Sequence, residues 1–134
     1  MVNIETSMIN QATLALPHAY APYSNFQVAS CLCSEDGSFF TGVNVENAAY
    51  GLTICAESAA ICHMIAAGQR KIKSIVVLNG ENTLCPPCGA CRQRILEFSQ
   101  PDTVVHLCTN QRVIKTMKIT ELLPEAFRFK PNQD

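Results

Sequence analysis

The spacing of hydrophobic residues along the chain predicts alternating helices and strands joined by short connections. In the stretches expected to be helical, apolar residues recur three or four positions apart, whereas the expected strands are short runs rich in apolar and β-favouring residues. Glycine, proline and acidic turn residues separate these stretches. The predicted helices cover residues 3–16, 53–67 and 89–99, with a last helical turn at 119–123. The predicted strands cover residues 26–33, 38–45, 74–79, 103–108 and 112–118.

Two of these stretches carry more detailed predictions. In the second helix, Thr53 is the expected N-cap, and Ile54, Ile61 and Ile65 are expected to form its buried stripe. The strand at 74–79 contains a continuous apolar run, which is typical of a strand buried on both faces. The order of the elements indicates one sheet with helices packed on it, an α/β fold whose strands pair both antiparallel and parallel.

Composition and charge narrow the class of protein. The 134 residues, 48% of them hydrophobic, predict a single domain over residues 1–134 with an ample core. The net charge is -1 and the only basic cluster is the short segment 70–73, so a surface for nucleic acid is not expected. The N-terminal residues do not resemble a signal peptide, and no apolar run approaches the ~20 residues of a membrane span. We therefore expect a cytoplasmic protein that does not enter a membrane.

The chain contains eight cysteines, which such a protein is expected to keep reduced or to use for metal binding. Half of them lie inside apolar stretches and are expected to be small core residues. These are Cys31, Cys33, Cys62 and Cys108.

Three of the remaining four cysteines and one glutamate form the pattern that carries most of the chemistry. Cys55-Ala56-Glu57 is followed by a Pro-Cys-Gly-Ala-Cys segment that supplies Cys88 and Cys91. Three soft ligands and a carboxylate that is not a ligand describe a catalytic zinc site, because a metal that activates water keeps one coordination position open. The thiols fall at the starts of two predicted helices, where the exposed amides favour the thiolate that binds zinc.

Two other readings of the cysteines stay open at this point. Cys85 adds a second, overlapping Cys-x-x-Cys, so Cys55, Cys85, Cys88 and Cys91 would suffice for a closed structural zinc site. Such a site has no use for Glu57 beside a ligand. A thioredoxin-like redox centre would need only one Cys-x-x-Cys at the start of a helix, and it leaves the Cys-Ala-Glu motif unexplained.

Five segments together resemble the cytidine deaminase family, over about residues 10–127. Position 55 is a cysteine, whereas some relatives have histidine there, and in this respect the chain resembles the small, homotetrameric branch of the family. Pro86 is a departure, because the family commonly has serine at this position. The segments are Tyr-Ala-Pro-Tyr-Ser-Asn-Phe-Gln-Val at 20–28, Gly-Val-Asn-Val-Glu-Asn-Ala-Ala-Tyr at 42–50, Cys-Ala-Glu at 55–57, Pro-Cys-Gly-Ala-Cys-Arg-Gln at 87–93 and Glu-Leu-Leu-Pro at 121–124.

The resemblance implies a three-layer α/β/α fold with a mixed, roughly five-stranded sheet. It also implies hydrolytic deamination of cytidine and 2'-deoxycytidine to uridine and 2'-deoxyuridine plus ammonia, a reaction of pyrimidine salvage. Zinc held by Cys55, Cys88 and Cys91 would activate the water that attacks C4 of the pyrimidine, and Glu57 would shuttle the protons. The active sites of the implied homotetramer lie at subunit interfaces.

The same resemblance assigns the substrate contacts. Asn44 and Glu46 would bind the ribose hydroxyls, for which an amide and a carboxylate are suitable partners. Phe26 and Ala56 would contact the nucleoside, together with Phe127 from a neighbouring subunit.

Two departures from the family pattern qualify the prediction. Ser58 stands where three-cysteine relatives usually have an arginine that offsets the negative charge of the zinc site, and our hypothesis is that Arg94, one helical turn beyond Cys91, supplies that charge. Arg92 is a second candidate.

In having Ala29-Ser30 and lacking that arginine, the chain resembles blasticidin S deaminases, so a modified cytosine nucleoside is the alternative substrate. A structural zinc-binding module is the non-enzymatic alternative, and the acidic pI of about 6.3 argues against a polynucleotide-editing deaminase.

Overall fold

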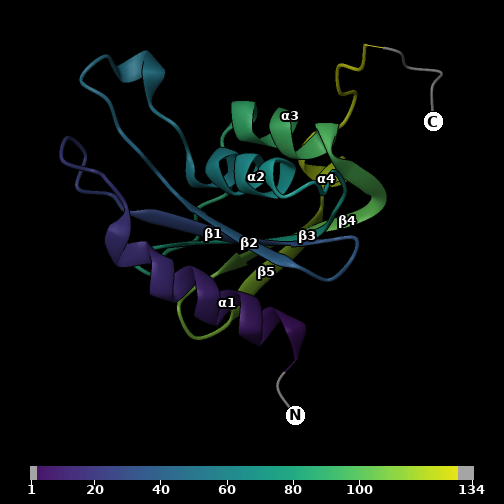
Figure 1. Cartoon of the computed structure of the whole chain (residues 1–134), viewed down its shortest axis with the longest axis horizontal. Coiled ribbons are helices and arrows are strands. Elements are labelled where there is room, and N and C mark those ends of the chain that lie inside the picture. Colours follow the sequence, from purple (N-terminus) through teal and green to yellow (C-terminus); the bar gives the residue numbers. More distant parts are fainter. Residues whose placement is uncertain (1–2, 130–134) are drawn as a thin grey trace.

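A mixed sheet forms the middle layer of the protein in the computed structural model, which describes residues 3–129 (Figure 1). Its strand order is β2-β1-β3-β4-β5, and only β3 and β4 run parallel to each other. This architecture confirms the predicted mixed, five-stranded sheet. The strands are β1 (Val28–Ser34), β2 (Phe39–Val43), β3 (Ile72–Asn79), β4 (Ser99–Cys108) and β5 (Val113–Lys118).

Helices cover both faces of the sheet (Figure 1). Helix α1 (Ile4–Ala15) lies on one face, and α2 (Ala56–Ala66), α3 (Gly89–Glu97) and α4 (Ile119–Leu122) lie on the other. The result is the three-layer α/β/α arrangement that the sequence predicts. Among residues 3–129 no helix has the length and apolar character needed to cross a bilayer.

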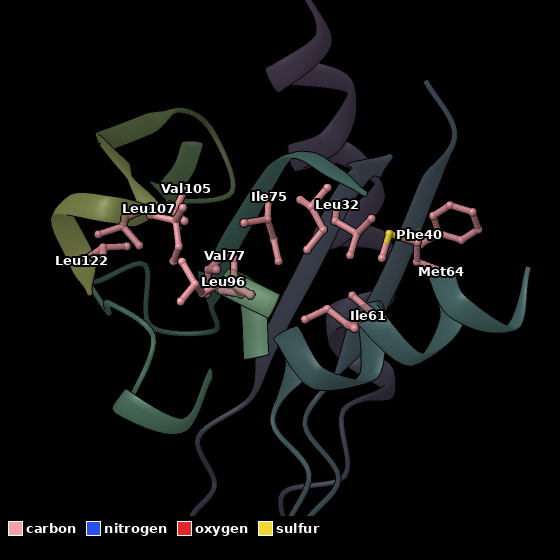
Figure 2. Packing of buried hydrophobic residues seen from close by; sticks show 14 residues of the cluster. Leu32, Phe40, Ile61, Met64, Ile75, Val77, Leu96, Val105, Leu107 and Leu122 are labelled. Carbon is pink, nitrogen blue, oxygen red and sulfur yellow. The ribbon is translucent and has the colours of Figure 1, made fainter. Parts of the chain in front are cut away.

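Each face of the sheet has its own hydrophobic core. The larger core fills the space between the sheet and α2, α3 and α4, where Ile61 and Leu96 meet strand residues such as Ile75 (Figure 2). The smaller core packs Met8 and its neighbours on α1 against the opposite face of the sheet. Three of the four cysteines predicted to be core residues lie in this smaller core: Cys31, Cys33 and Cys108. The prediction for Cys62 is wrong, because its position on α2 leaves it exposed.

Helix α2 begins later than the sequence predicts. Thr53 is not its N-cap, because residues 50–52 form a 3-10 turn and Ile54 then makes an antiparallel bridge with Val45. Cys55 is the N-cap instead. The predicted stripe is also wrong in part, since Ile61 is buried but Ile54 and Ile65 are 45% and 38% exposed.

The residues that α2 turns toward the sheet are Ala56, Glu57, Ala60, Ile61 and Met64. Small residues at two of these positions let the helix lie close to the sheet. The same face carries the acidic side chain of Glu57 into the interior.

The crossover from β3 to β4 positions the second group of cysteines. The loop at residues 80–88 leaves the carboxyl end of β3 and leads into α3, whose N-cap is Cys88. Ligands of α/β proteins commonly bind beyond the carboxyl ends of parallel strands. The start of α3 therefore lies where a site is expected.

Candidate active site

The N-termini of α2 and α3 meet at a cavity of about 380 Å³. Cys55 is the N-cap of α2, Cys88 is the N-cap of α3, and Cys91 lies in the first turn of α3. A volume of this size is within the usual range for small-molecule sites. The residues lining the cavity are Ser24, Phe26, Val28, Asn44, Glu46, Tyr50, Thr53, Cys55, Ala56, Glu57, Val77, Cys85, Pro86, Pro87, Cys88 and Cys91.

Three potential metal-binding groups cluster in the wall of this cavity. The sulfur atoms of Cys55 and Cys91 and a carboxylate oxygen of Glu57 all lie within 4.8 Å of one another. Cys88 lines the same cavity but is exposed and lies outside this tight group. The structure thus brings two of the predicted zinc ligands and the predicted proton shuttle together, with the third predicted ligand at the rim.

The donor set fits a zinc ion. The sulfur atoms of Cys55 and Cys91 are within bonding distance, yet the Cα atoms of these residues are 7.4 Å apart. Disulfides usually join Cα atoms that are about 4.4–6.8 Å apart, so the backbone is spaced too widely for a relaxed cross-link. Two thiolates of a tetrahedral zinc site lie roughly 3.8 Å apart, a separation that this backbone accommodates.

Glu57 is an acidic side chain in a buried position. It is only 4% exposed, and this burial raises the pKa of its carboxyl group above the usual range, an effect that its own backbone amide partly opposes. A carboxyl group whose pKa is shifted upward exchanges its proton more readily near neutral pH. The environment of Glu57 therefore favours proton transfer.

Cys85 also lies close to Glu57 but is a poor fourth thiolate. Burial raises the pKa of the Cys85 thiol, and the negative charge of Glu57 raises it further. The raised pKa of this thiol favours an open zinc site over the closed four-thiolate site.

Asn44 and Glu46 are buried and already hold parts of the backbone. The Asn44 amide accepts a hydrogen bond from the Val28 N–H at 3.0 Å and donates to the Phe26 carbonyl at 2.9 Å. Glu46 accepts hydrogen bonds from the backbone amides of Tyr23 and Ser24 and from the Ser24 hydroxyl. The bond from that hydroxyl, followed by those from the amides, lowers the pKa of the Glu46 carboxyl group.

Both side chains keep capacity for a ligand. An amide has two N–H donors and two oxygen lone pairs, and a carboxylate accepts about four hydrogen bonds, so neither Asn44 nor Glu46 is saturated by its backbone partners. Each of them lines the cavity. The backbone bonds fix the two side chains in place before any ligand arrives.

The other predicted contact residues divide into two groups. Phe26 and Ala56 line the cavity. Phe127 does not line it, and its side chain is 71% exposed while its carbonyl accepts a hydrogen bond from Gln93.

Ser58 and Arg94 form a contact behind the cluster. Arg94 donates a hydrogen bond from Nη1 to the Ser58 Oγ at 3.0 Å, and the same nitrogen lies 3.8 Å from the Cys55 Sγ. Ser58 Oγ lies 3.0 Å from the Cys55 Sγ. Arg92 is engaged elsewhere, since it donates to the carbonyls of Pro87 and Leu122.

Comparison with known proteins places this geometry in a family. Residues 2–107 match the family model described as the cytidine and deoxycytidylate deaminase zinc-binding region. The chain belongs to this deaminase family. It is 44% identical to a cytidine deaminase of Halalkalibacterium halodurans over 90% of the chain and 91% of that protein. A cytidine deaminase of Mycoplasma genitalium is 41% identical over 95% of the chain and 97% of its own length.

A solved structure supports the same assignment. The crystal structure of cytidine deaminase from Burkholderia pseudomallei matches with a TM-score of 0.86 and 41% identity, covering 94% of this chain and all of that one. The deaminase fold therefore extends across almost the whole chain.

Sequence reasoning missed part of this deaminase site. Ser24 lines the cavity and bonds to Glu46, and its hydroxyl also accepts a hydrogen bond from the Phe26 amide at 3.0 Å. Its place beside Phe26 in the 20–28 segment is a signal that could have found it. Tyr50, the last residue of the 42–50 segment, and Thr53 also line the cavity.

Proposed function

We propose that the chain catalyses the hydrolytic deamination of cytidine and 2'-deoxycytidine to uridine and 2'-deoxyuridine, with release of ammonia. The observation that carries the proposal is the buried carboxyl group of Glu57 beside the thiols of Cys55 and Cys91 in a nucleoside-sized cavity. The similar proteins named cytidine deaminases support the choice of substrate. Such an enzyme would serve pyrimidine salvage in the cytoplasm.

In the proposed site, Cys55, Cys88 and Cys91 would hold a zinc ion. The ion would supply an activated water by lowering the pKa of the water toward neutrality. The N-termini of α2 and α3 favour the thiolate forms of these cysteines through the positive ends of the helix dipoles. Cys88, which precedes Cys91 by one helical turn, completes the ligand set from the rim of the cavity.

Glu57 moves the protons of the reaction. It accepts a proton from the attacking water and delivers it to N3 of the pyrimidine. It then accepts the second proton from the hydroxyl formed on C4 and gives it to the amine, which leaves C4 as ammonia. The oxygen of the water remains on C4 as the carbonyl of the product. A single carboxyl group performs both transfers because its raised pKa and its position next to the thiols suit it to accept and donate at one place.

The remaining cavity residues orient the nucleoside. Asn44 and Glu46 bind the ribose hydroxyls with the hydrogen-bonding capacity left over from their backbone contacts. Phe26 and Ala56 contact the nucleoside from the cavity wall.

The proposed assembly is a homotetramer with Phe127 completing the cavity of a neighbouring subunit. Its support is the exposure of Phe127 outside its own cavity and an apolar groove of about 700 Å³ whose lining includes Leu52 and Ile54, which are 66% and 45% exposed. Large exposed apolar surfaces commonly mark protein contacts. Sedimentation of the purified chain tests the assembly, and a monomer at assay concentration would contradict it.

The test of function is the loss of the cytosine absorbance when zinc-loaded protein is mixed with cytidine or 2'-deoxycytidine. Glu57→Gln is expected to lower kcat by at least about 100-fold, because it removes the proton shuttle while keeping the size of the side chain. Glu97→Gln, at an exposed position near the end of α3, is the matched control and should be unchanged.

Two outcomes would contradict the proposal. Absence of turnover on both nucleosides together with turnover of blasticidin S would favour the modified nucleoside. A Glu57→Gln protein with wild-type turnover would remove the proposed mechanism.

A further inference from the structure

The contact of Arg94 and Ser58 with Cys55 lies outside the substrate cavity and has no part in the proposed reaction steps. The two residues instead help to line the apolar groove and are absent from the lining of the cavity. Arg94 is exposed at this surface, whereas Ser58 is 8% exposed. A positive charge is thus held close to a predicted metal ligand from outside the active site.

The chemistry of the donors sets the direction of the hydrogen bonds. A guanidinium group has N–H donors and no acceptor, so Ser58 Oγ is the acceptor in its contact with Arg94. The hydroxyl proton of Ser58 is then free to point at the Cys55 sulfur, 3.0 Å away. A thiolate is an acceptor only, so with Cys55 in its metal-binding form the serine must be the donor.

We propose that Arg94 is a positioning residue that holds the sulfur of Cys55 in place both directly and through Ser58. This inference rests on the proposed function only in taking Cys55 as a zinc ligand. The guanidinium orients the Ser58 hydroxyl, the hydroxyl donates to the sulfur, and the positive charge offsets the negative charge that three thiolates leave on the site.

The expected effect on zinc affinity follows from charge. Zn²⁺ held by three thiolates gives the site a net charge of -1. The guanidinium of Arg94 lies beside one of these sulfur atoms, so its positive charge offsets part of that negative charge. Partners of this kind typically change metal affinity by about 10-fold to 100-fold.

The test measures zinc affinity by competition with a chelator at pH 7. Arg94→Gln removes the charge, and Ser58→Ala removes the hydroxyl; each is expected to weaken zinc binding by about 10-fold. Because part of the effect of Arg94 passes through Ser58, the double variant should weaken zinc binding by less than the product of the two single effects. Arg70→Gln, beyond the opposite end of α2, removes the same charge far from Cys55 and is the matched control.

A second readout is the thiolate-to-metal charge-transfer absorption of the Co²⁺-substituted protein. Loss of a donor to sulfur raises the energy of the sulfur lone pairs, so Arg94→Gln and Ser58→Ala should both move this absorption to longer wavelength. A change that merely loosened the fold would lower thermal stability and leave the absorption where it is.

Two results would overturn the proposal. The first is an Arg94→Gln protein whose zinc affinity and Co²⁺ absorption match the wild type. The second is a double variant whose loss equals the product of the single losses, because Arg94 would then act independently of Ser58. Neither readout depends on turnover, so a chain that fails to deaminate cytidine would contradict the proposed function without deciding this inference.

Discussion

Gly42, on β2, lies tightly against the backbone of α2. A Cβ atom at this residue would lie 2.3 Å from the backbone nitrogen of Ala60 and 2.4 Å from the carbonyl oxygen of Ala56. Both atoms belong to the backbone of α2, so neither can rotate out of the way. The helix that they belong to also carries Glu57 and begins at Cys55. We therefore predict that Gly42→Ala perturbs both stability and catalysis.

The size of the effect follows from these distances. Non-bonded heavy atoms normally approach to about 3.5 Å, so α2 or β2 must move by about 1 Å to admit the methyl group. Overpacking of this kind costs about 1–3 kcal/mol, and the upper part of that range applies because the obstacles are backbone atoms. The stiffer unfolded chain of an alanine variant returns about 0.4–1 kcal/mol, which leaves a net loss of about 2 kcal/mol.

The same displacement should be visible in the reaction. A shift of about 1 Å in a catalytic group can lower the rate by about 100-fold, and Glu57 moves with α2. Urea unfolding and the cytidine assay measure the two effects in parallel. Gly51→Ala is the matched control, because a Cβ atom there meets no other atom within 4 Å. A Gly42→Ala protein with wild-type unfolding midpoint and turnover would refute the reasoning.

Three further predictions concern the metal, the cavity wall and the smaller core. Removing zinc with a chelator should lower the melting temperature reversibly, because a ligand present at about 1,000 times its Kd contributes about 4 kcal/mol; an unchanged melting temperature would argue against a bound metal. Asn44→Ala should lower the free energy of unfolding by about 1–3 kcal/mol even without substrate, since it leaves the Val28 amide and Phe26 carbonyl unpaired. If the Asn44→Ala protein shows no loss of stability in urea unfolding, the role of Asn44 is limited to ligand binding. Burial raises the pKa of the Cys31 thiol to about 12 from an ordinary value of 9.0, so the thiol stabilises the fold fully below pH 9 and progressively less up to pH 12. Cys31→Ala should therefore reduce the loss of stability between pH 8 and pH 10 by about 1.4 kcal/mol, and an unchanged pH dependence in urea unfolding would contradict the assignment.

The elements that the sequence predicts well are those whose signal is local. The predicted strand at 74–79 corresponds to β3 (Ile72–Asn79), because a continuous apolar run has few alternatives to a buried strand. The predicted helix at 3–16 corresponds to α1 (Ile4–Ala15), whose N-cap Asn3 accepts a hydrogen bond from the Thr6 amide. In both cases the predictive signal lies within the residues of the element itself.

The start of α2 shows where local reasoning stops. Thr53 has the chemistry of an N-cap, but Ile54 pairs with Val45 and is held in an extended conformation. Val45 is nine positions earlier in the chain, so the competition between cap and bridge depends on tertiary structure. No pattern within the helix reveals it.

The candidate site divides in the same way. The motif identifies Cys55, Glu57 and Cys91 because a metal site needs particular residue types at particular spacings, and the structure brings them together. The backbone contacts of Asn44 and the approach of Arg94 to Ser58 join residues that are far apart in sequence. The sequence motif therefore predicts which side chains form the site, whereas the residues that hold these side chains in place are known only from the fold.

The two cysteines that cap α2 and α3 show how stability and function compete at this site. Neither Cys55 nor Cys88 makes a side-chain capping hydrogen bond, although replacing a good N-cap residue typically costs about 1 kcal/mol. Serine or aspartate at these positions would satisfy a helix amide and direct its oxygen back into the helix. A cysteine leaves the positive ends of both helices directed at the cavity, where they stabilise thiolates. The absence of a side-chain capping bond at each helix start would therefore allow both cysteines to bind the proposed zinc ion.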